Sequence, residues 1–201
     1  MNAEEICKEL RIDHSKILNI YAYGSVVYGT NVEYSDKDYI IVYKSAFLPS
    51  GSFKDNAISS YDRNIQGVCY SRTGFKDAIN NYEIGALECL YLPNEFIIQN
   101  KMNFSITKFD EKIFSKKIIS KASSSWHLST LADKDGNTPF VMKNIFHALR
   151  ILDFAIQIKE HGKIINFSSM NEKMVKIYNN HNIRPYDYYD EFINLQEKLK
   201  K

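Results

Sequence analysis

Long hydrophobic runs are absent from this sequence of 201 residues. No apolar stretch approaches the roughly eighteen residues that a membrane-spanning helix requires. The N-terminus is polar and lacks the apolar core of a signal peptide. The sequence therefore predicts a cytoplasmic protein with no membrane partner.

Cysteine is scarce, and the three thiols are those of Cys7, Cys69 and Cys89. Their number is odd and their wide spacing matches no metal-binding pattern. A disulfide framework and a cysteine-based metal site are therefore both excluded. Cys69 and Cys89 lie in apolar runs, so we expect them to pack as small hydrophobic residues.

An excess of charge of either sign is also missing, because 26 Lys and Arg residues nearly balance 24 Asp and Glu residues. A net charge of +2 does not indicate a polycation that binds nucleic acid over its whole surface. An RNA or DNA ligand would need a local basic patch. With 44% hydrophobic and 13% aromatic residues, the chain has the composition of a folded protein of one large or two small domains.

Hydrophobic periodicity divides the chain into a mixed first half and a helical second half. It predicts strands at 17–23 and 37–43 and a hairpin over 58–71, and helices at 73–82, 84–91, 111–131 and 138–161. A capping box of Ser169 and Glu172 predicts a further short helix, and Arg184 with Pro185 opens the last one. Residues 96–109 show no clear pattern. We expect an α+β lobe over 1–105 and a helical lobe over 106–201.

The most informative segment runs from Gly24 to Asp38. Gly24 and Ser25 follow the first predicted strand, and Asp36 and Asp38 open the second one. Residues two apart in a strand point to the same side, so the two carboxylates should stand together. Such a pair suits a hard cation such as Mg²⁺. Gly24 permits close approach of the backbone to a ligand, and Ser25 supplies a hydroxyl and an N–H to a phosphate.

Gly-Ser turns and Asp-x-Asp pairs are each common, and the specificity lies in their combination. Gly-Ser, then ten residues of which the last is a serine, and then Asp-x-Asp before an aliphatic strand resembles the signature of the DNA polymerase beta-like nucleotidyltransferase superfamily. The Tyr-Gly-Thr-Asn at 28–31 also resembles a stretch of that signature. The resemblance implies a nucleotidyltransferase fold, with a mixed β-sheet flanked by helices and a C-terminal α-helical lobe closing the nucleotide cleft.

The resemblance further implies transfer of an NMP unit, with AMP from ATP favoured, to a hydroxyl acceptor with release of pyrophosphate. Asp36 and Asp38 would ligate two Mg²⁺ or Mn²⁺ ions that clamp the attacking and leaving oxygens. Ser25 and the amides of the Gly24 turn would hold the β- and γ-phosphates of the NTP.

The superfamily normally adds a third carboxylate on a later strand, and here the sequence departs from the pattern. Gln66 occupies the best-aligned position. An amide ligates a metal less well than a carboxylate and cannot act as a general base. Asp62, at the turn before that strand, is the catalytic candidate in its place, although it can equally be a turn residue. Glu88 is the other nearby acid.

The helical half contains a basic face. Lys143, His147 and Arg150 are four and three residues apart, so they share one side of the predicted helix 138–161. The opposite side of that helix is an apolar core stripe. A face of this kind can be simply solvated or can bind an anion.

The Lys-x-x-x-His-Ala-Leu-Arg pattern of this face resembles the helix motif of a narrower branch, the predicted nucleotidyltransferases associated with RNA repair. Residues 87–90, Leu-Glu-Cys-Leu, resemble a second motif of that branch. The branch resemblance implies that Lys143 and Arg150 bind phosphate and that His147 contacts the nucleotide. Lys121, on the preceding helix, is a further phosphate-binding candidate.

The branch resemblance alone favours an RNA 3′ end as the acceptor, with tRNA included. Two alternatives stay open. The same spacing occurs in nucleotidyltransferases that modify a protein or a small molecule, of the toxin–antitoxin or antibiotic adenylyltransferase type. Gln66 also leaves room for a catalytically silent regulator that binds NTP.

Overall fold

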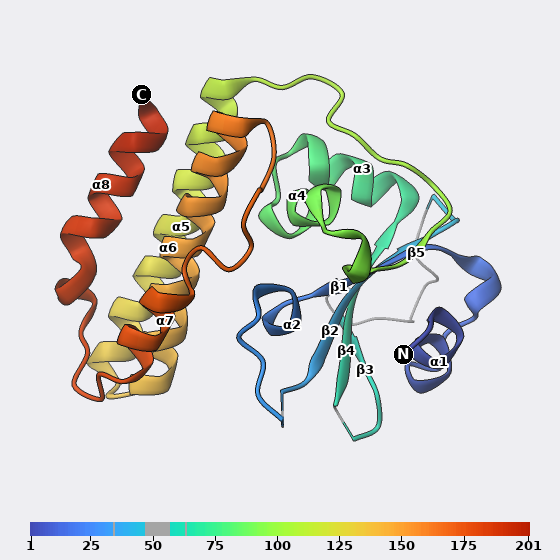
Figure 1. Ribbon diagram of the computed structural model, residues 1–201, viewed down its shortest axis with the longest axis horizontal. Coiled ribbons are helices and arrows are strands. Elements are labelled where there is room, and N and C mark those ends of the chain that lie inside the picture. Colours follow the sequence, from blue (N-terminus) through green and yellow to red (C-terminus); the bar gives the residue numbers. More distant parts are fainter. Residues whose placement is uncertain (34, 47–56, 63) are drawn as a thin grey trace. The chain divides into compact units, whose positions relative to one another are not determined.

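The computed structural model describes residues 1–33, 35–46, 57–62 and 64–201 (Figure 1). For residues 47–56 the turn-forming composition of the sequence predicts a loop, and these residues lie outside the described ranges. The chain divides into two compact units, Met1–Lys108 and Phe109–Lys201. This division falls three residues after the boundary that the sequence suggested. No helix in the described ranges is long and apolar enough to cross a membrane.

The first unit is built on a mixed β-sheet. Its strands lie in the order β3-β4-β2-β1-β5, in which β2 and β4 are parallel and the other neighbours are antiparallel. The bounds are β1 (Ile17–Tyr23), β2 (Lys37–Tyr43), β3 (Ala57–Ser59), β4 (Ile65–Ser71) and β5 (Ile97–Asn100). The predicted strands at 17–23 and 37–43 and the predicted hairpin are confirmed.

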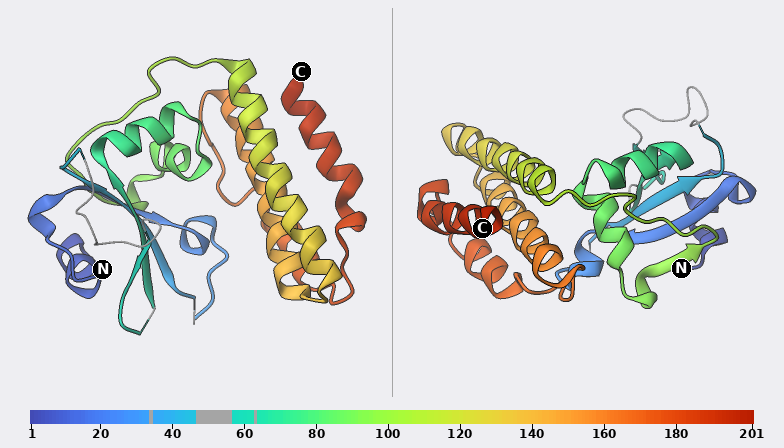
Figure 2. Two further views of the ribbon diagram at one scale, coloured as in Figure 1. Left: turned by 180° about the vertical axis from the view of Figure 1, so that it is seen from behind. Right: turned by 90° about the horizontal axis from the view of Figure 1, so that it is seen from above.

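Helices pack on both faces of this sheet (Figures 1 and 2). On one face Phe75 stacks on Tyr21 at 5.9 Å and meets Tyr70 edge-on at 5.5 Å, measured between ring centroids. On the other face the side chain of Leu10 packs against the strand at Gly67, because a Cβ added to Gly67 would lie 3.5 Å from it. The helices and 3₁₀ turns of this unit are α1 (Ala3–Glu9), η1 (His14–Lys16), α2 (Ser25–Tyr28), α3 (Arg72–Asn80), α4 (Ile84–Tyr91) and η2 (Asn94–Phe96).

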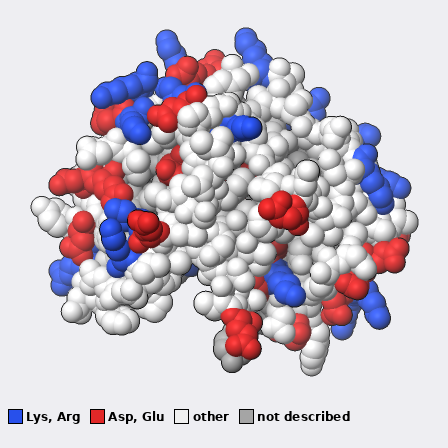
Figure 3. Space-filling view, viewed as in Figure 1, with Lys and Arg blue, Asp and Glu red and all other residues white. Residues whose placement is uncertain are grey.

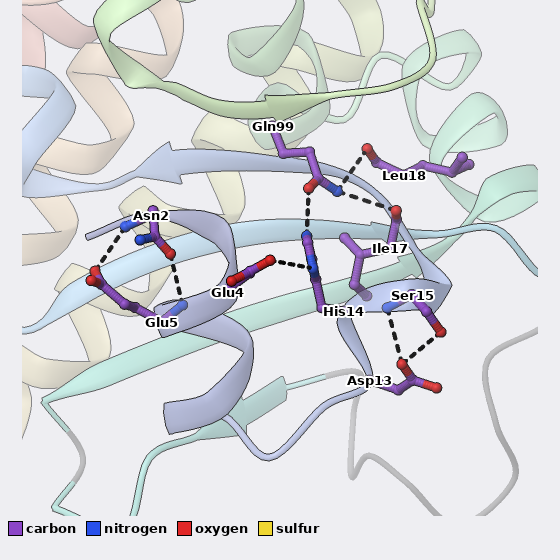
Figure 4. Close-up of polar contacts among 9 residues, drawn as sticks. All are labelled: Asn2, Glu4, Glu5, Asp13, His14, Ser15, Ile17, Leu18 and Gln99. Carbon is purple, nitrogen blue, oxygen red and sulfur yellow. Dashed lines mark hydrogen bonds and ion pairs between the residues drawn. The ribbon is translucent and has the colours of Figure 1, made fainter.

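A hydrogen-bonded histidine ties η1 to the edge strand β5 (Figure 4). Gln99 Nε2 donates to the carbonyls of Ile17 and Leu18, at 3.2 Å each. The amide oxygen of Gln99 therefore accepts from His14 Nε2, which lies 2.7 Å away. His14 Nδ1 lies 3.9 Å from a carboxylate oxygen of Glu4. The side chain of His14 thus joins α1, η1 and β5.

Strand β5 lies in the segment that the sequence left without a pattern. It has only four residues, and none of them is fully buried. Its position depends on the buried side chain of Asn19, which accepts hydrogen bonds from the backbone N–H groups of Lys101 and Met102. Pairing with distant residues, not local alternation, therefore makes this segment a strand.

The second unit is helical throughout and confirms the predicted helical half of the α+β fold. Helices α5 and α6 lie side by side as a hairpin, and α8 packs on both (Figures 1 and 2). Trp126 on α5 stacks on Phe192 on α8 with ring centroids 4.2 Å apart. Its elements are α5 (Glu111–Lys134), α6 (Thr138–His161), α7 (Asn171–Tyr178), η3 (Pro185–Tyr188) and α8 (Tyr189–Lys200).

The predicted capping box of Ser169 and Glu172 is wrong. Helix α7 begins at Asn171 and has no side-chain cap. The Ser169 hydroxyl instead donates to the carboxylate of Asp153 at 2.5 Å, and it accepts from Gln157 Nε2 at 3.1 Å. Both partners lie on α6. The Ser169 hydroxyl therefore makes tertiary hydrogen bonds instead of the local helix cap that the sequence pattern predicted.

Candidate active site

The Gly-Ser turn lies between β1 and the short helix α2. Gly24 has a φ of 73° and a ψ of −146°, a conformation that L-residues rarely adopt. A Cβ added to Gly24 would lie 2.5 Å from a carboxylate oxygen of Asp38. The backbone of the turn therefore lies directly against this carboxylate, and the two halves of the motif meet in space.

The carboxylates cluster where β2 and β4 begin. In the register of the sheet, Asp38 is flanked by Tyr23 on β1 and by Gln66 on β4. Gln66 Nε2 donates to a carboxylate oxygen of Asp36 at 2.5 Å. Asp36 and Asp38 thus stand on either side of Lys37, and Gln66 neighbours both.

The third acidic ligand is missing from this arrangement. Among the described residues, no group of three or more His, Cys, Asp and Glu side chains could hold a metal ion. Two carboxylates nevertheless fit Mg²⁺, which proteins often bind through one or two carboxylates together with substrate phosphates and water. Asp36 and Asp38 are therefore the residues that would hold a divalent ion.

Asp62 closes the turn between β3 and β4. Its carboxylate accepts from the Ser60 hydroxyl at 2.6 Å, and from the backbone N–H and side-chain amide of Asn64 at 3.1 and 2.6 Å. The hydrogen bond from Ser60 and those from Asn64 hold the pKa of Asp62 below its usual value. Asp62 thus has the contacts of a turn residue, and its catalytic role stays a prediction.

A small cavity of about 170 Å³ opens beside Asp38 in the first unit. Its lining is mostly apolar and aromatic and holds neither lysine nor arginine among the described residues. The lining residues are Tyr23, Asp38, Tyr39, Ala57, Ile58, Gln66, Gly67 and Val68. The cavity therefore combines one carboxylate, one amide and a largely apolar wall.

Glu88 is buried on α4, with 1% of its surface exposed. One of its carboxylate oxygens accepts a hydrogen bond of 2.6 Å from the hydroxyl of Tyr28, the last residue of α2. The sequence pointed to Glu88 as an acid near the site. Its partner could not be found from the sequence, because 60 residues separate the two.

The basic residues of the second unit also come together. Arg150 Nη2 lies 3.0 Å from His147 Nδ1. Arginine has no acceptor, so His147 Nδ1 accepts and the neutral ring carries its proton on Nε2. Burial, together with the charges of Arg150, Lys121 and Lys143, lowers the pKa of His147 to about 3. His147 is therefore an uncharged donor within a cluster of cations.

Arg150 itself is 8% exposed, and its guanidinium carbon lies 5.4 Å from the ring centroid of Phe146. The second unit carries fifteen Lys and Arg residues against eleven Asp and Glu residues. Figure 3 nevertheless shows basic and acidic side chains intermingled over the visible face of the molecule, without a continuous basic surface. The group of Lys121, Lys143, His147 and Arg150 is called the basic cluster below.

Comparison with known proteins finds similarity in structure but not in sequence. No protein-family model and no curated protein sequence matches this chain. Among solved structures, the crystal structure of spectinomycin adenyltransferase from Enterococcus faecialis with ATP and spectinomycin matches it with a TM-score of 0.51. The match covers 99% of this chain and 98% of that chain at 15% sequence identity. The chain has a nucleotidyltransferase fold.

The nucleotidyltransferase fold was predicted from the Gly-Ser and Asp-x-Asp spacing, and this prediction is confirmed. At 15% identity the likeness shows the fold alone. The narrower resemblance to the RNA-repair branch receives no support from these comparisons. The catalytic and nucleotide-binding roles of individual residues stay predictions.

Proposed function

We propose that this protein is a metal-dependent nucleotidyltransferase that transfers AMP from ATP to a hydroxyl acceptor and releases pyrophosphate. The observation that carries the proposal is the contact between the Gly24 backbone and the Asp38 carboxylate. It brings the turn that is predicted to bind phosphate against a carboxylate that is predicted to bind metal, and it does so within a nucleotidyltransferase fold.

In this proposal Asp36 and Asp38 hold the divalent ions, and Ser25 with the amides of its turn holds the β- and γ-phosphates. Bound Mg²⁺ or Mn²⁺ supplies the positive charge that offsets the charge growing on the phosphoryl oxygens. Gln66 fixes one carboxylate oxygen of Asp36 through its amide. This hydrogen bond restricts the Asp36 carboxylate before the nucleotide binds.

The basic cluster of Lys121, Lys143, His147 and Arg150 supports the binding of a polyanion. Three of its members carry positive charge, and His147 offers an uncharged Nε2–H donor. Triphosphate is the natural ligand for such a group. That this unit closes over a nucleotide held by the first unit stays a prediction.

We infer that the acceptor is a small hydroxyl-bearing molecule of neutral or positive charge. The cavity beside Asp38 has about 170 Å³ and a mostly apolar lining. An RNA 3′ end would bring phosphates to a cavity that contains a carboxylate and, among the described residues, no lysine or arginine. The similar solved structure is that of an adenyltransferase with ATP and an antibiotic.

The proposal is tested by measuring pyrophosphate release from each of the four NTPs with Mg²⁺ or Mn²⁺. Parallel reactions contain a panel of small amino and hydroxyl compounds, total tRNA or no acceptor. Release should require a small-molecule acceptor and should vanish in the Asp36→Ala/Asp38→Ala variant. The Asp133→Ala/Asp135→Ala variant removes two carboxylates from the C-terminal end of α5 in the second unit and should retain activity.

Release that requires tRNA instead would assign the acceptor to RNA and contradict the inference from the cavity. Binding of Mg²⁺-ATP that is unchanged by Asp62→Ala, without pyrophosphate release in the presence of any acceptor, would indicate a silent regulator. The absence of a carboxylate at position 66 motivates that outcome, because an amide cannot serve as a general base.

A further inference from the structure

We propose that Glu88 positions the Gly24–Ser25 turn, and that it acts through the hydroxyl of Tyr28. The proposal rests on the proposed function, because the turn is the part of the site that would hold the phosphates of ATP. Glu88 is a positioning residue in this scheme and touches neither substrate nor metal.

The two side chains form a buried hydrogen bond. Glu88 is 1% exposed and Tyr28 is 3% exposed, and their oxygens lie 2.6 Å apart. This distance is at the short end of the range for hydrogen bonds between two oxygens. In surroundings of low dielectric constant such a bond is strengthened further, and its loss leaves a costly buried acceptor.

Helix α2 depends on this anchor because it cannot be stable by itself. It contains only Ser25–Tyr28, and Gly29 ends it in the left-handed conformation with a φ of 69°. A single helical turn is far below the length at which helices form in water. Ser25 is the first residue of α2 and Tyr28 is the last. Holding Tyr28 in place therefore also holds Ser25 in place.

Helix α4 supports the other side of the same turn. Tyr23 immediately precedes Gly24, and its ring meets the ring of Tyr28 edge-on at 6.4 Å. A Cβ added to Gly85 on α4 would lie 3.2 Å from the Tyr23 hydroxyl, so helix and tyrosine are in close contact there. Gly85 and Glu88 are three residues apart and share one face of α4. One face of a single helix thus contacts the residues at both ends of the turn.

The consequence is that α4 fixes the distance between the phosphate-binding turn and the carboxylate of Asp38. The turn already lies in contact with Asp38 through Gly24. A displacement of a catalytic group by about 1 Å can lower a rate on the order of a hundredfold. We therefore expect Tyr28→Phe, which removes one hydroxyl and keeps the ring, to lower kcat/KM for ATP by about tenfold or more.

The test compares Tyr28→Phe with Tyr82→Phe. Tyr82 also donates through its hydroxyl, to the Lys108 carbonyl at 3.2 Å, and it lies outside the site. Both variants lose one buried tyrosine hydrogen bond, but only Tyr28→Phe should weaken Mg²⁺-ATP binding and turnover. Glu88→Gln keeps an acceptor oxygen for Tyr28 and should retain more activity than Glu88→Ala. In the Tyr28→Phe/Glu88→Ala double variant the losses should not add, because both changes break one contact.

Hydrogen exchange of the backbone amides at 25–30 keeps the inference separable from the proposed function. Tyr28→Phe should increase exchange at these amides without any nucleotide present, whereas Tyr82→Phe should not. If the wild-type protein binds no NTP but this increase is seen, the proposed function fails and the positioning role stands. Equal exchange and equal nucleotide affinity in the two tyrosine variants would overturn the inference.

Discussion

The backbone of Gly24 touches the carboxylate of Asp38, with one oxygen 2.5 Å from the position that a Cβ would occupy. The two residues are fourteen positions apart in the sequence, and antiparallel pairing of β1 with β2 brings them together. The turn that is predicted to bind phosphate and the carboxylate that is predicted to bind metal thereby share one wall of the candidate active site.

Gly24→Ala should abolish Mg²⁺-ATP binding and lower the stability of the protein. The new Cβ would collide with Asp38, and the φ of 73° is strained for alanine. Gly136→Ala is the matched control, because Gly136 has a φ of 66° and no atom within 4 Å of the added Cβ. The control should lose about 1 kcal/mol from backbone strain alone. Thermal unfolding and nucleotide titration of both variants distinguish strain from collision.

Gln66→Glu should make the stability of the protein depend on divalent metal. The new carboxylate would face Asp36 at the place where the Gln66 amide now donates. Without metal, the like charges should lower the unfolding free energy by up to about 1 kcal/mol. Added Mn²⁺ should more than restore it, because a third oxygen ligand strengthens the site. Melting temperatures with and without Mn²⁺ test this, and Gln66→Ala should show no such gain.

Asp62→Asn and Asp62→Ala should separate a turn role from a catalytic one. Asparagine can still accept from Ser60 and Asn64, whereas alanine cannot. If Asp62 only closes the turn, Asp62→Asn should retain both melting temperature and turnover, and Asp62→Ala should lower the melting temperature. Loss of turnover in Asp62→Asn without loss of stability would instead support the predicted catalytic role.

His147 should make the second unit sensitive to mild acid. Its folded-state pKa is lowered to about 3, whereas an unfolded histidine titrates near 6.5. The unfolded chain therefore binds the proton first, and stability is lost as the pH falls below 6.5. Each pH unit costs up to about 1.4 kcal/mol, so about 2 kcal/mol should be lost between pH 6.5 and 5. In denaturant unfolding, His147→Gln should not show this loss of stability between pH 6.5 and 5. If the unfolding free energies of wild type and variant fall equally with pH, His147 is not the group responsible.

Lys121→Ala/Lys143→Ala should weaken Mg²⁺-ATP binding by about tenfold, which corresponds to about 1.4 kcal/mol. Both lysines are exposed, and they lie close enough to His147 for their charge to lower its pKa. The effect should shrink as salt is added, because exposed charges are screened. Lys112→Ala/Lys116→Ala removes two exposed lysines from the same unit and is the control. Equal nucleotide affinity in both double variants would show that Lys121 and Lys143 do not bind the nucleotide.

The sequence determined what depends on neighbours along the chain. Strands β1 and β2 follow from aliphatic and aromatic runs, and the long helices of the second unit follow from their apolar stripes. The Gly-Ser turn and the Asp-x-Asp pair could be recognised because each has a local spacing. The same is true of the basic face of α6, whose members are one helical turn apart.

Only the tertiary structure decided which distant groups meet. The family resemblance already put position 66 near Asp36 and Asp38, but no pattern in the sequence indicates the hydrogen bond between Gln66 and Asp36, which the parallel pairing of β2 with β4 allows. Three further features also depend on residues that are distant in the sequence. They are the pairing of strand β5, the hydrogen bond between Tyr28 and Glu88, and the hydrogen bond between Ser169 and Asp153 on α6. The physical reason is that local patterns report the conformation of a segment. The partners of a buried polar group, in contrast, are set by how the segments pack.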